Sequence, residues 1–360
     1  MLANIENLTS NYFENNVSFG DLLTYKVKSA KPDDMHFTLD YLTPYFKLES
    51  DVLPRKSFVL ISLGSDEHSQ FRTRMCQGSY RNVRVHYDNV AKEFYDGYPT
   101  RILLLENGNH ILIDTRNTTY VFPNPLANDA KYVFMRVLRA TAQKDIETMG
   151  FVQAHAASVA INGKAILLVG AGGAGKTTMM LTAVLGGAGF ISNDKTFLFP
   201  AGNSKGIVAY GWPYSINIDL GTTALLPQIQ PLFNHMDHYQ HYEWDSYKRG
   251  KRTFTPIELR RVLGKDITSK APLAAIIYID PTYRKEEVLR IEADAGIAWF
   301  RDNVRTYEFT DWVSGTVDEF DGVGDTVIPK LLAKAPFFKA GRFQSSQKLI
   351  AMLEDLERRL

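Results

Sequence analysis

The chain has 360 residues, of which 45% are hydrophobic and 22% charged, a composition typical of a soluble globular protein of one or two domains. Its 41 Lys and Arg and 40 Asp and Glu leave a net charge of +1, so no overall charge favours binding to nucleic acid or to an anionic membrane. A single cysteine, Cys76, excludes a disulfide framework and a cysteine zinc site. The first residues lack the basic and apolar regions of a signal peptide, and the apolar runs are shorter than a membrane span. We therefore expect a cytoplasmic protein that binds neither nucleic acid nor membrane.

Short apolar segments rich in β-branched residues dominate the first part of the chain, at 57–63, 82–87, 101–106, 110–114 and 118–122. Asn107-Gly108 separates two of them, and Asn-Gly is a favoured pair for the type I′ turn of a β-hairpin. A second reversal at Arg116-Asn117 precedes the last segment. The pattern predicts an antiparallel meander, and hence a β-rich N-terminal region over residues 1–125.

Beyond residue 125 the apolar period becomes that of a helix. Val133, Phe134, Val137 and Leu138 share one face of a helix predicted over 129–149, and Gly150 ends it. The segments that follow predict one more helix and several strands: helix 177–185 and strands 152–161, 164–169, 190–192, 206–210, 215–218 and 274–279. We assign residues 126–335 to a second domain.

The C-terminal segment, residues 336–360, contains an amphipathic helix over 348–360. Its apolar stripe would dock either on the body of the protein or on another subunit, and we expect the body. A homo-oligomer remains open at this point.

Residues 170–177 match the complete G-x-x-x-x-G-K-[ST] motif between a predicted strand and a predicted helix. Glycines allow positive φ angles and a close approach to an anion, so successive N–H groups can surround phosphates at a helix N-terminus. Lys176 supplies a charge for the β- and γ-phosphates, and the Thr177 hydroxyl is a ligand for Mg²⁺. The motif predicts that a nucleoside triphosphate is bound by Gly170, Ala171, Gly172, Gly173, Ala174, Gly175, Lys176, Thr177 and Thr178.

Two carboxylates compete for the role of holding the metal or accepting a proton. Asp280 follows the apolar run 274–279, in the manner of the Walker B strand of nucleotide-binding proteins, although Asp280-Pro281 also fits a plain strand-ending turn. Asp194 ends the shorter segment 190–193 and lies eighteen residues after Lys176. Spacing alone leaves both open.

Three segments together resemble the core of HPr kinase/phosphorylase and its relatives, which include kinases of peptide natural products. These segments are 155–164, the phosphate loop 170–177 and 187–194. In both patterns a His lies fifteen residues before the first loop glycine, and an Asp lies eighteen residues after the loop lysine. The resemblance covers about residues 150–285 and leaves the first 125 residues and the last 70 unmatched.

The resemblance implies an α/β fold, α+β in part, with a mixed sheet and the phosphate-loop core that this family shares with phosphoenolpyruvate carboxykinase. It implies ATP and Mg²⁺ as cofactors and Asp194 as the base on the acceptor hydroxyl, so Asp194 is favoured over Asp280. His155 becomes a partner on the phosphate side, Lys176 keeps its catalytic role, and the metal ligands are Thr177, Asn193 and Asp194. The sequence departs from the family at Asn193, where the pattern has a first Asp.

Two further clusters have a functional interpretation and an ordinary one, in which they form solvated surface. The basic stretch 248–261, with Lys248, Arg249, Lys251, Arg252, Arg260 and Arg261, would either clamp phosphates or form a solvated surface, which we favour. His235, His238 and His241 are spaced so that one helical face cannot hold all three, which argues against a metal site. We expect the stretch 233–244 to be surface or a loop over the acceptor pocket.

Taken together, the sequence predicts an enzyme, an ATP-dependent kinase with an alcohol group as acceptor. The acceptor would be a small-molecule or peptide hydroxyl, with a protein serine as second choice. The alternatives are an ATPase or nucleotide switch without an acceptor, and a degenerate nucleotide-binding module in which Asn193 marks lost catalysis.

Overall fold

The computed structural model describes residues 12–20, 22–43, 45–48, 53–86, 89–95, 100–106, 108–201, 206–234, 251–283, 285–302, 330, 332, 335–341 and 346–359. They form two compact units, the first ending at Met149 and the second beginning at Gly150. The division thus falls after the helix predicted over 129–149, whereas the change in sequence character lies near residue 125.

The first unit is built on a nine-stranded sheet in the order β3-β1-β2-β4-β9-β8-β7-β6-β5. Its strands are β1 (Phe13–Phe19), β2 (Leu23–Ser29), β3 (Phe46–Leu48), β4 (Lys56–Leu60), β5 (Tyr80–His86), β6 (Asn89–Tyr95), β7 (Arg101–Leu105), β8 (His110–Asp114) and β9 (Thr118–Phe122). Strands β5 to β9 are successive antiparallel neighbours, which confirms the predicted meander for this part. The prediction is wrong for β4, which pairs in parallel with both β2 and β9.

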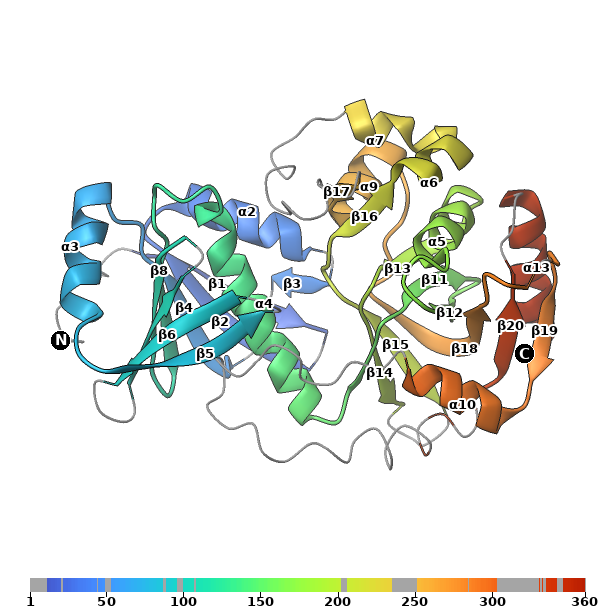
Figure 1. The fold of residues 1–360 in the computed structure, drawn as a ribbon, viewed down its shortest axis with the longest axis horizontal. Coiled ribbons are helices and arrows are strands. Elements are labelled where there is room, and N and C mark those ends of the chain that lie inside the picture. The colour runs from blue at the N-terminus through green and yellow to red at the C-terminus, as the bar shows by residue number, and fades with distance from the viewer. Residues whose placement is uncertain are drawn as a thin grey trace. The chain divides into compact units, whose positions relative to one another are not determined.

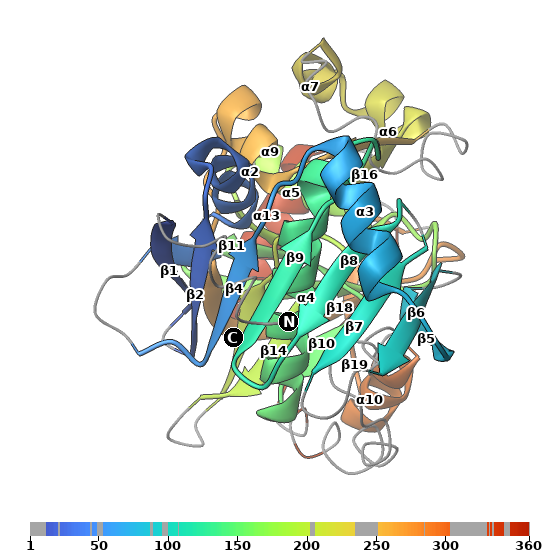
Figure 2. The same ribbon diagram turned by 90° about the vertical axis from the view of Figure 1, so that its left-hand side faces the viewer.

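Helices explain the parallel pairing, because parallel strands need a crossover connection. Helix α2 (Pro32–Leu42) lies between β2 and β4 in the chain, and α3 (Ser65–Met75) lies between β4 and β5. Neither helix is among the elements predicted from the sequence. Figure 2 shows this sheet face-on, with α3 in front of it and α4 (Ala130–Thr148) behind it. The first unit is therefore a three-layer arrangement of helix, sheet and helix.

Each face of this sheet has its own core. On one face Phe71 of α3 packs against Phe122 of β9, with 4.5 Å between ring centroids. On the other face the Tyr25 hydroxyl of β2 donates a 2.6 Å hydrogen bond to the Asp145 carboxylate of α4. Within α4, the polar Thr141 on the buried face is satisfied by a 3.0 Å hydrogen bond to the Val137 carbonyl. The helix predicted over 129–149 is confirmed.

The second unit has a mixed sheet in the order β10-β14-β15-β18-β12-β11-β13, with β20 pairing β18 and β19 pairing β20. Its strands are β10 (Val152–Ala154), β11 (Ala157–Ile161), β12 (Lys164–Val169), β13 (Gly189–Ser192), β14 (Thr196–Pro200), β15 (Ile207–Gly211), β18 (Lys270–Ile279), β19 (Val288–Ile291) and β20 (Phe337–Ala340). The pairs β12–β18 and β18–β20 are parallel, and the remaining pairs are antiparallel. The described chain is thus a mixed α/β protein.

The single strand predicted over 152–161 is wrong, because it breaks at His155. Strand β10 pairs with β14, whereas β11 pairs with β12 and β13. A tight bend between them, with the Ala156 N–H donating to the Ala154 carbonyl at 2.9 Å, lets the chain change partners. The change of partner places His155 opposite the turn that joins β13 to β14.

Helices cover both sides of this second sheet. Figure 1 shows α5 (Lys176–Leu185) and α10 (Ala293–Arg301) on opposite sides of its strands. Phe300 of α10 belongs to the same buried cluster as Leu167 and Val169 of β12. Helix α13 (Ser346–Arg359) packs on α5 and buries a leucine stripe, as expected for docking on the body: Leu349, Leu353 and Leu356.

A small two-stranded sheet, β16 (Ile216–Asp219) with β17 (Lys251–Phe254), adjoins α5. Short helical segments surround it: α6 (Leu220–Leu225), a 3₁₀ turn (Pro227–Ile229), α7 (Gln230–Asn234) and α9 (Pro256–Leu263). Across the described ranges of the chain, no helix has both the length and the apolar character needed to cross a membrane.

Candidate functional site

The glycine-rich loop 170–175 connects β12 to α5, so the motif has the strand–loop–helix setting that it requires. Gly170, Gly173 and Gly175 have φ angles of 152°, 77° and 106°. A Cβ on Gly170 would lie 2.8 Å from the carbonyl oxygen of Ile279, so the loop rests directly on the end of β18. Only glycine fits there, and the loop is held where its N–H groups and the start of α5 can face an anion.

The side chain of Lys176 folds back over this loop. Its ammonium donates to the carbonyl oxygens of Gly170 at 2.6 Å and of Ala171 at 3.2 Å. These hydrogen bonds hold the positive charge of Lys176 at the loop. A cation beside a glycine-rich loop at a helix N-terminus is an arrangement that can attract an anion.

Beside Lys176, the Thr177 hydroxyl reaches the turn that follows β13. It donates a 3.0 Å hydrogen bond to Oδ1 of Asn193, a residue with only 4% of its surface exposed. The turn is tight, because the Lys195 N–H donates to the Asn193 carbonyl at 2.9 Å and the Ser192 hydroxyl donates to the Lys195 carbonyl.

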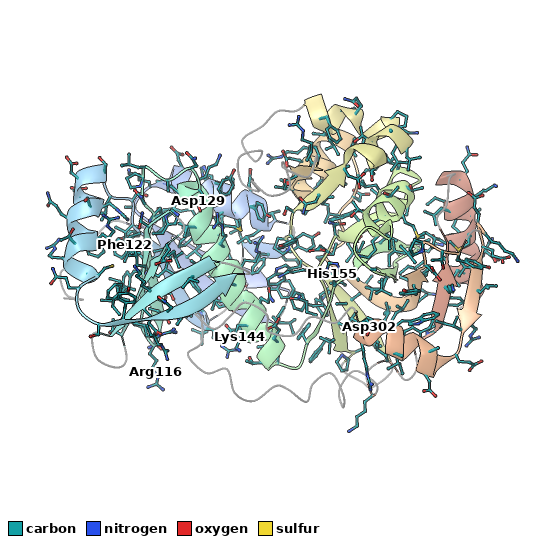
Figure 3. The ribbon with its side chains drawn as sticks, in the orientation of Figure 1. Arg116, Phe122, Asp129, Lys144, His155 and Asp302 are labelled. Atoms are coloured by element: carbon teal, nitrogen blue, oxygen red, sulfur yellow. The ribbon has the colours of Figure 1, made fainter. Side chains whose placement is uncertain are left out.

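Asp194 occupies the centre of that turn with a φ of 71°, a left-handed conformation that Asp adopts more readily than most residues. Its Oδ1 lies 3.1 Å from Nδ1 of His155, which comes from the bend between β10 and β11. The His155 side chain is 19% exposed and that of Asp194 34%. Figure 3 labels His155 within the second unit. The fold thus brings together His155, Lys176, Thr177, Asn193 and Asp194, from three separate parts of the sequence.

Asp280, the competing carboxylate, is engaged in a different network. Its Oδ2 accepts from the Lys339 ammonium at 2.7 Å, and its Oδ1 accepts from the backbone N–H and the hydroxyl of Thr282 at 2.8 and 2.6 Å. These hydrogen bonds lower the pKa of Asp280 to about 2, and the one from Lys339 has the largest effect. Both carboxylate oxygens of Asp280 therefore form hydrogen bonds at the end of β18, as expected for a strand-ending turn.

The hydroxyl of Thr178, a residue predicted to contact phosphate, has a partner outside the loop. Its hydroxyl forms a 2.8 Å hydrogen bond with the hydroxyl of Thr222, whose N–H donates to Oδ1 of Asp219 at 2.6 Å. Asp219 is the N-cap of α6, a role that its position before a helical segment could have suggested. Sequence reasoning missed Thr222 and Asp219 because nothing in their spacing relates them to the loop.

The other sequence candidates contribute less to this site. Arg260 and Arg261 are exposed on α9, which fits a solvated helix face. Cys76 is partly buried, and burial raises the pKa of its thiol to about 11. The histidines at 235, 238 and 241, with Lys248 and Arg249, lie outside the described residues.

The oxygen atoms at the loop suit a magnesium ion in chemical type. Thr177 offers a hydroxyl, Asn193 an amide oxygen and Asp194 a carboxylate, and hard oxygen donors are what Mg²⁺ takes. Within the described ranges, no cluster of three or more His, Cys, Asp or Glu side chains could itself hold a metal. A metal here would thus rely on phosphate oxygens and water for its remaining ligands.

Comparison with known proteins gives a distant likeness. No family model and no curated protein matches the sequence. Among solved structures, the HPr(Ser) kinase/phosphatase from Coxiella burnetii is similar over 57% of this chain and 94% of its own, with 11% identity and a TM-score of 0.28. The likeness is remote, and the function proposed below is derived from the geometry of the site.

Proposed function

We propose that the protein is an ATP-dependent kinase that transfers the γ-phosphate to a hydroxyl group of a small molecule or peptide. The observation that carries the proposal is the convergence of a glycine-rich anion loop, a lysine, a hydroxyl and a histidine-supported carboxylate. Phosphoryl transfer is catalysed mainly by positioning and electrostatics, and these few groups supply both.

Asp194 is the proposed base. Its Oδ1 lies against His155, and its remaining lone pairs are available to the acceptor hydroxyl and to a metal ion. As the acceptor oxygen forms its bond to the γ-phosphorus, its proton moves to Asp194 and the bond to the β-phosphate oxygen breaks, which releases ADP. His155, whose Nδ1 lies 3.1 Å from Asp194 Oδ1, keeps the carboxylate oriented during this transfer.

The loop N–H groups and the Lys176 ammonium stabilise the charge that develops on the phosphate oxygens. A magnesium ion, when bound, would neutralise part of the charge on the phosphates. Thr177 and Asp194 are its proposed protein ligands.

The proposal is tested by ADP release from Mg²⁺-ATP, first without acceptor and then with a panel of hydroxyl compounds and serine peptides. Asp194→Asn should abolish turnover, because asparagine also tolerates the left-handed conformation and the change removes only the charge and the basicity. Asp280→Asn is the matched control and should retain turnover.

Loss of turnover with Asp280→Asn alone would contradict the proposal and indicate an ordinary ATPase with Asp280 as its metal carboxylate. Hydrolysis that depends on Asp194 and is not redirected by any acceptor would favour the nucleotide switch. The 34% exposure of Asp194 does admit water to the base, so some release of ADP without acceptor is expected.

A further inference from the structure

The contact between Thr177 and Asn193 determines where the hydroxyl proton of Thr177 points. A hydroxyl has one hydrogen and two lone pairs, whereas the side-chain oxygen of asparagine can only accept. At 3.0 Å, therefore, the Thr177 hydroxyl donates to Oδ1 of Asn193 and its lone pairs point elsewhere. A metal ligand must offer a lone pair, so this direction decides whether Thr177 can bind a cation.

Asn193 is fixed in the position that this task needs. It is 4% exposed, it follows β13 directly, and its own carbonyl is held by the Lys195 N–H at 2.9 Å. One of the two lone pairs of its side-chain oxygen already accepts from Thr177, and its amide nitrogen has no lone pair for a metal.

We propose that Asn193 is a positioning residue: it orients the Thr177 hydroxyl so that its oxygen faces the metal of the bound nucleotide, and it is not itself a metal ligand. This inference rests on the proposed function, since it concerns the metal of that same site. It also gives the departure at position 193 a physical meaning. Orienting a hydroxyl requires an acceptor oxygen but no charge, so an amide can replace a carboxylate here.

The charge of the site follows from this role. With an amide at 193, Asp194 is the one carboxylate that this turn offers to the cation. Asn193→Asp keeps an acceptor for Thr177 and adds a negative charge close to the metal. The Asn193→Asp variant should therefore bind the cation more tightly than the wild type.

The test measures binding, not turnover, with Mn²⁺ as the probe metal. Electron paramagnetic resonance titration of full-length protein with ADP gives the Mn²⁺ dissociation constant for wild type, Asn193→Leu, Thr177→Val and the double variant. We expect each single variant to weaken Mn²⁺ binding about ten-fold or more, as loss of a ligand's supporting hydrogen bond commonly does. The double variant should be no weaker than the weaker single variant, because Asn193 acts only through the Thr177 hydroxyl.

Two further measurements separate this role from a structural one. ADP affinity in EDTA should be unchanged by Asn193→Leu, since the loop and Lys176 do not need the metal to bind phosphate. Asn193→Asp should bind Mn²⁺ more tightly than the wild type, and it remains informative where the leucine variant does not fold.

Losses in the two single variants that multiply in the double variant would overturn the proposal and make Asn193 an independent ligand. Unchanged Mn²⁺ affinity in Asn193→Leu would overturn it equally. Both results would leave the proposed kinase function standing. A wild-type protein that binds no Mn²⁺-ADP would contradict the proposed function as well.

Discussion

Alanine at Gly170 should destabilise the second unit, because the backbone and the space around this residue both require glycine. Its φ of 152° lies where side-chain-bearing residues are rare, which costs about 1–3 kcal/mol. The new Cβ would lie 2.8 Å from the Ile279 carbonyl oxygen and 3.3 Å from Cβ of Ala174, which adds about 1–3 kcal/mol of overpacking. The neighbours can relax partly, so we expect a loss of about 2–4 kcal/mol in the free energy of unfolding.

Gly172→Ala is the matched control in the same loop. A Cβ at Gly172 has no atom within 4 Å, and its φ is not positive, so the change should stay within about 0.5 kcal/mol. Urea denaturation followed by circular dichroism measures both variants, and a thermal melt should show Gly170→Ala lower by roughly 5–15 °C. Equal stability of the two variants would refute the claim that the loop rests on the end of β18.

Three other predictions concern stability. Burial lowers the pKa of His68, so a proton binds more readily to the unfolded chain than to the folded one. The stability of the protein should therefore fall as the pH drops below about 6.5. His68→Leu should flatten that slope in thermal melts from pH 8 to 5. Asp280→Asn should cost about 1 kcal/mol of stability at pH 7, because it weakens the ion pair with Lys339. The stability that Asp280 contributes should disappear as the pH falls from 3.8 towards 2. An Asn variant with the urea midpoint of the wild type would contradict this. Thr255→Ala should cost about 1 kcal/mol by removing the N-cap of α9, whose Thr255 hydroxyl accepts from the Glu258 N–H at 3.2 Å, and a thermal melt checks it.

Local sequence patterns predicted the elements that depend on local physics. The helix over 129–149 and the strand–loop–helix around Gly170 follow from apolar period and glycine conformation, and both are present. Helix α3 was missed because only His68 and Phe71 of its eleven residues are buried, so it has no apolar stripe. It is instead supported by charge, with Asp66 and Glu67 in its first turn and arginines in its last.

The site was harder to foresee where it depends on strands that meet from distant parts of the chain. The break at His155 arises because β10 pairs with β14 whereas β11 pairs with β13, and no local sequence pattern predicts this difference. The 3.1 Å contact between His155 and Asp194 is a result of this pairing. The sequence offered it only through a family resemblance. The hydrogen bond from Thr177 to Asn193 likewise needed coordinates.

The parallel pairing of β12 with β18 has a consequence for how the protein is made. Val169 lies opposite Tyr278, 109 positions further along the chain, and Gly170 is packed against the residue after Tyr278. Closing so long a stretch is entropically costly and slows the formation of such contacts. During synthesis the phosphate loop is translated long before the strand that shapes it. The nucleotide proposed for this loop would therefore assist only the last stage of folding, by stabilising a unit whose sheet is already complete.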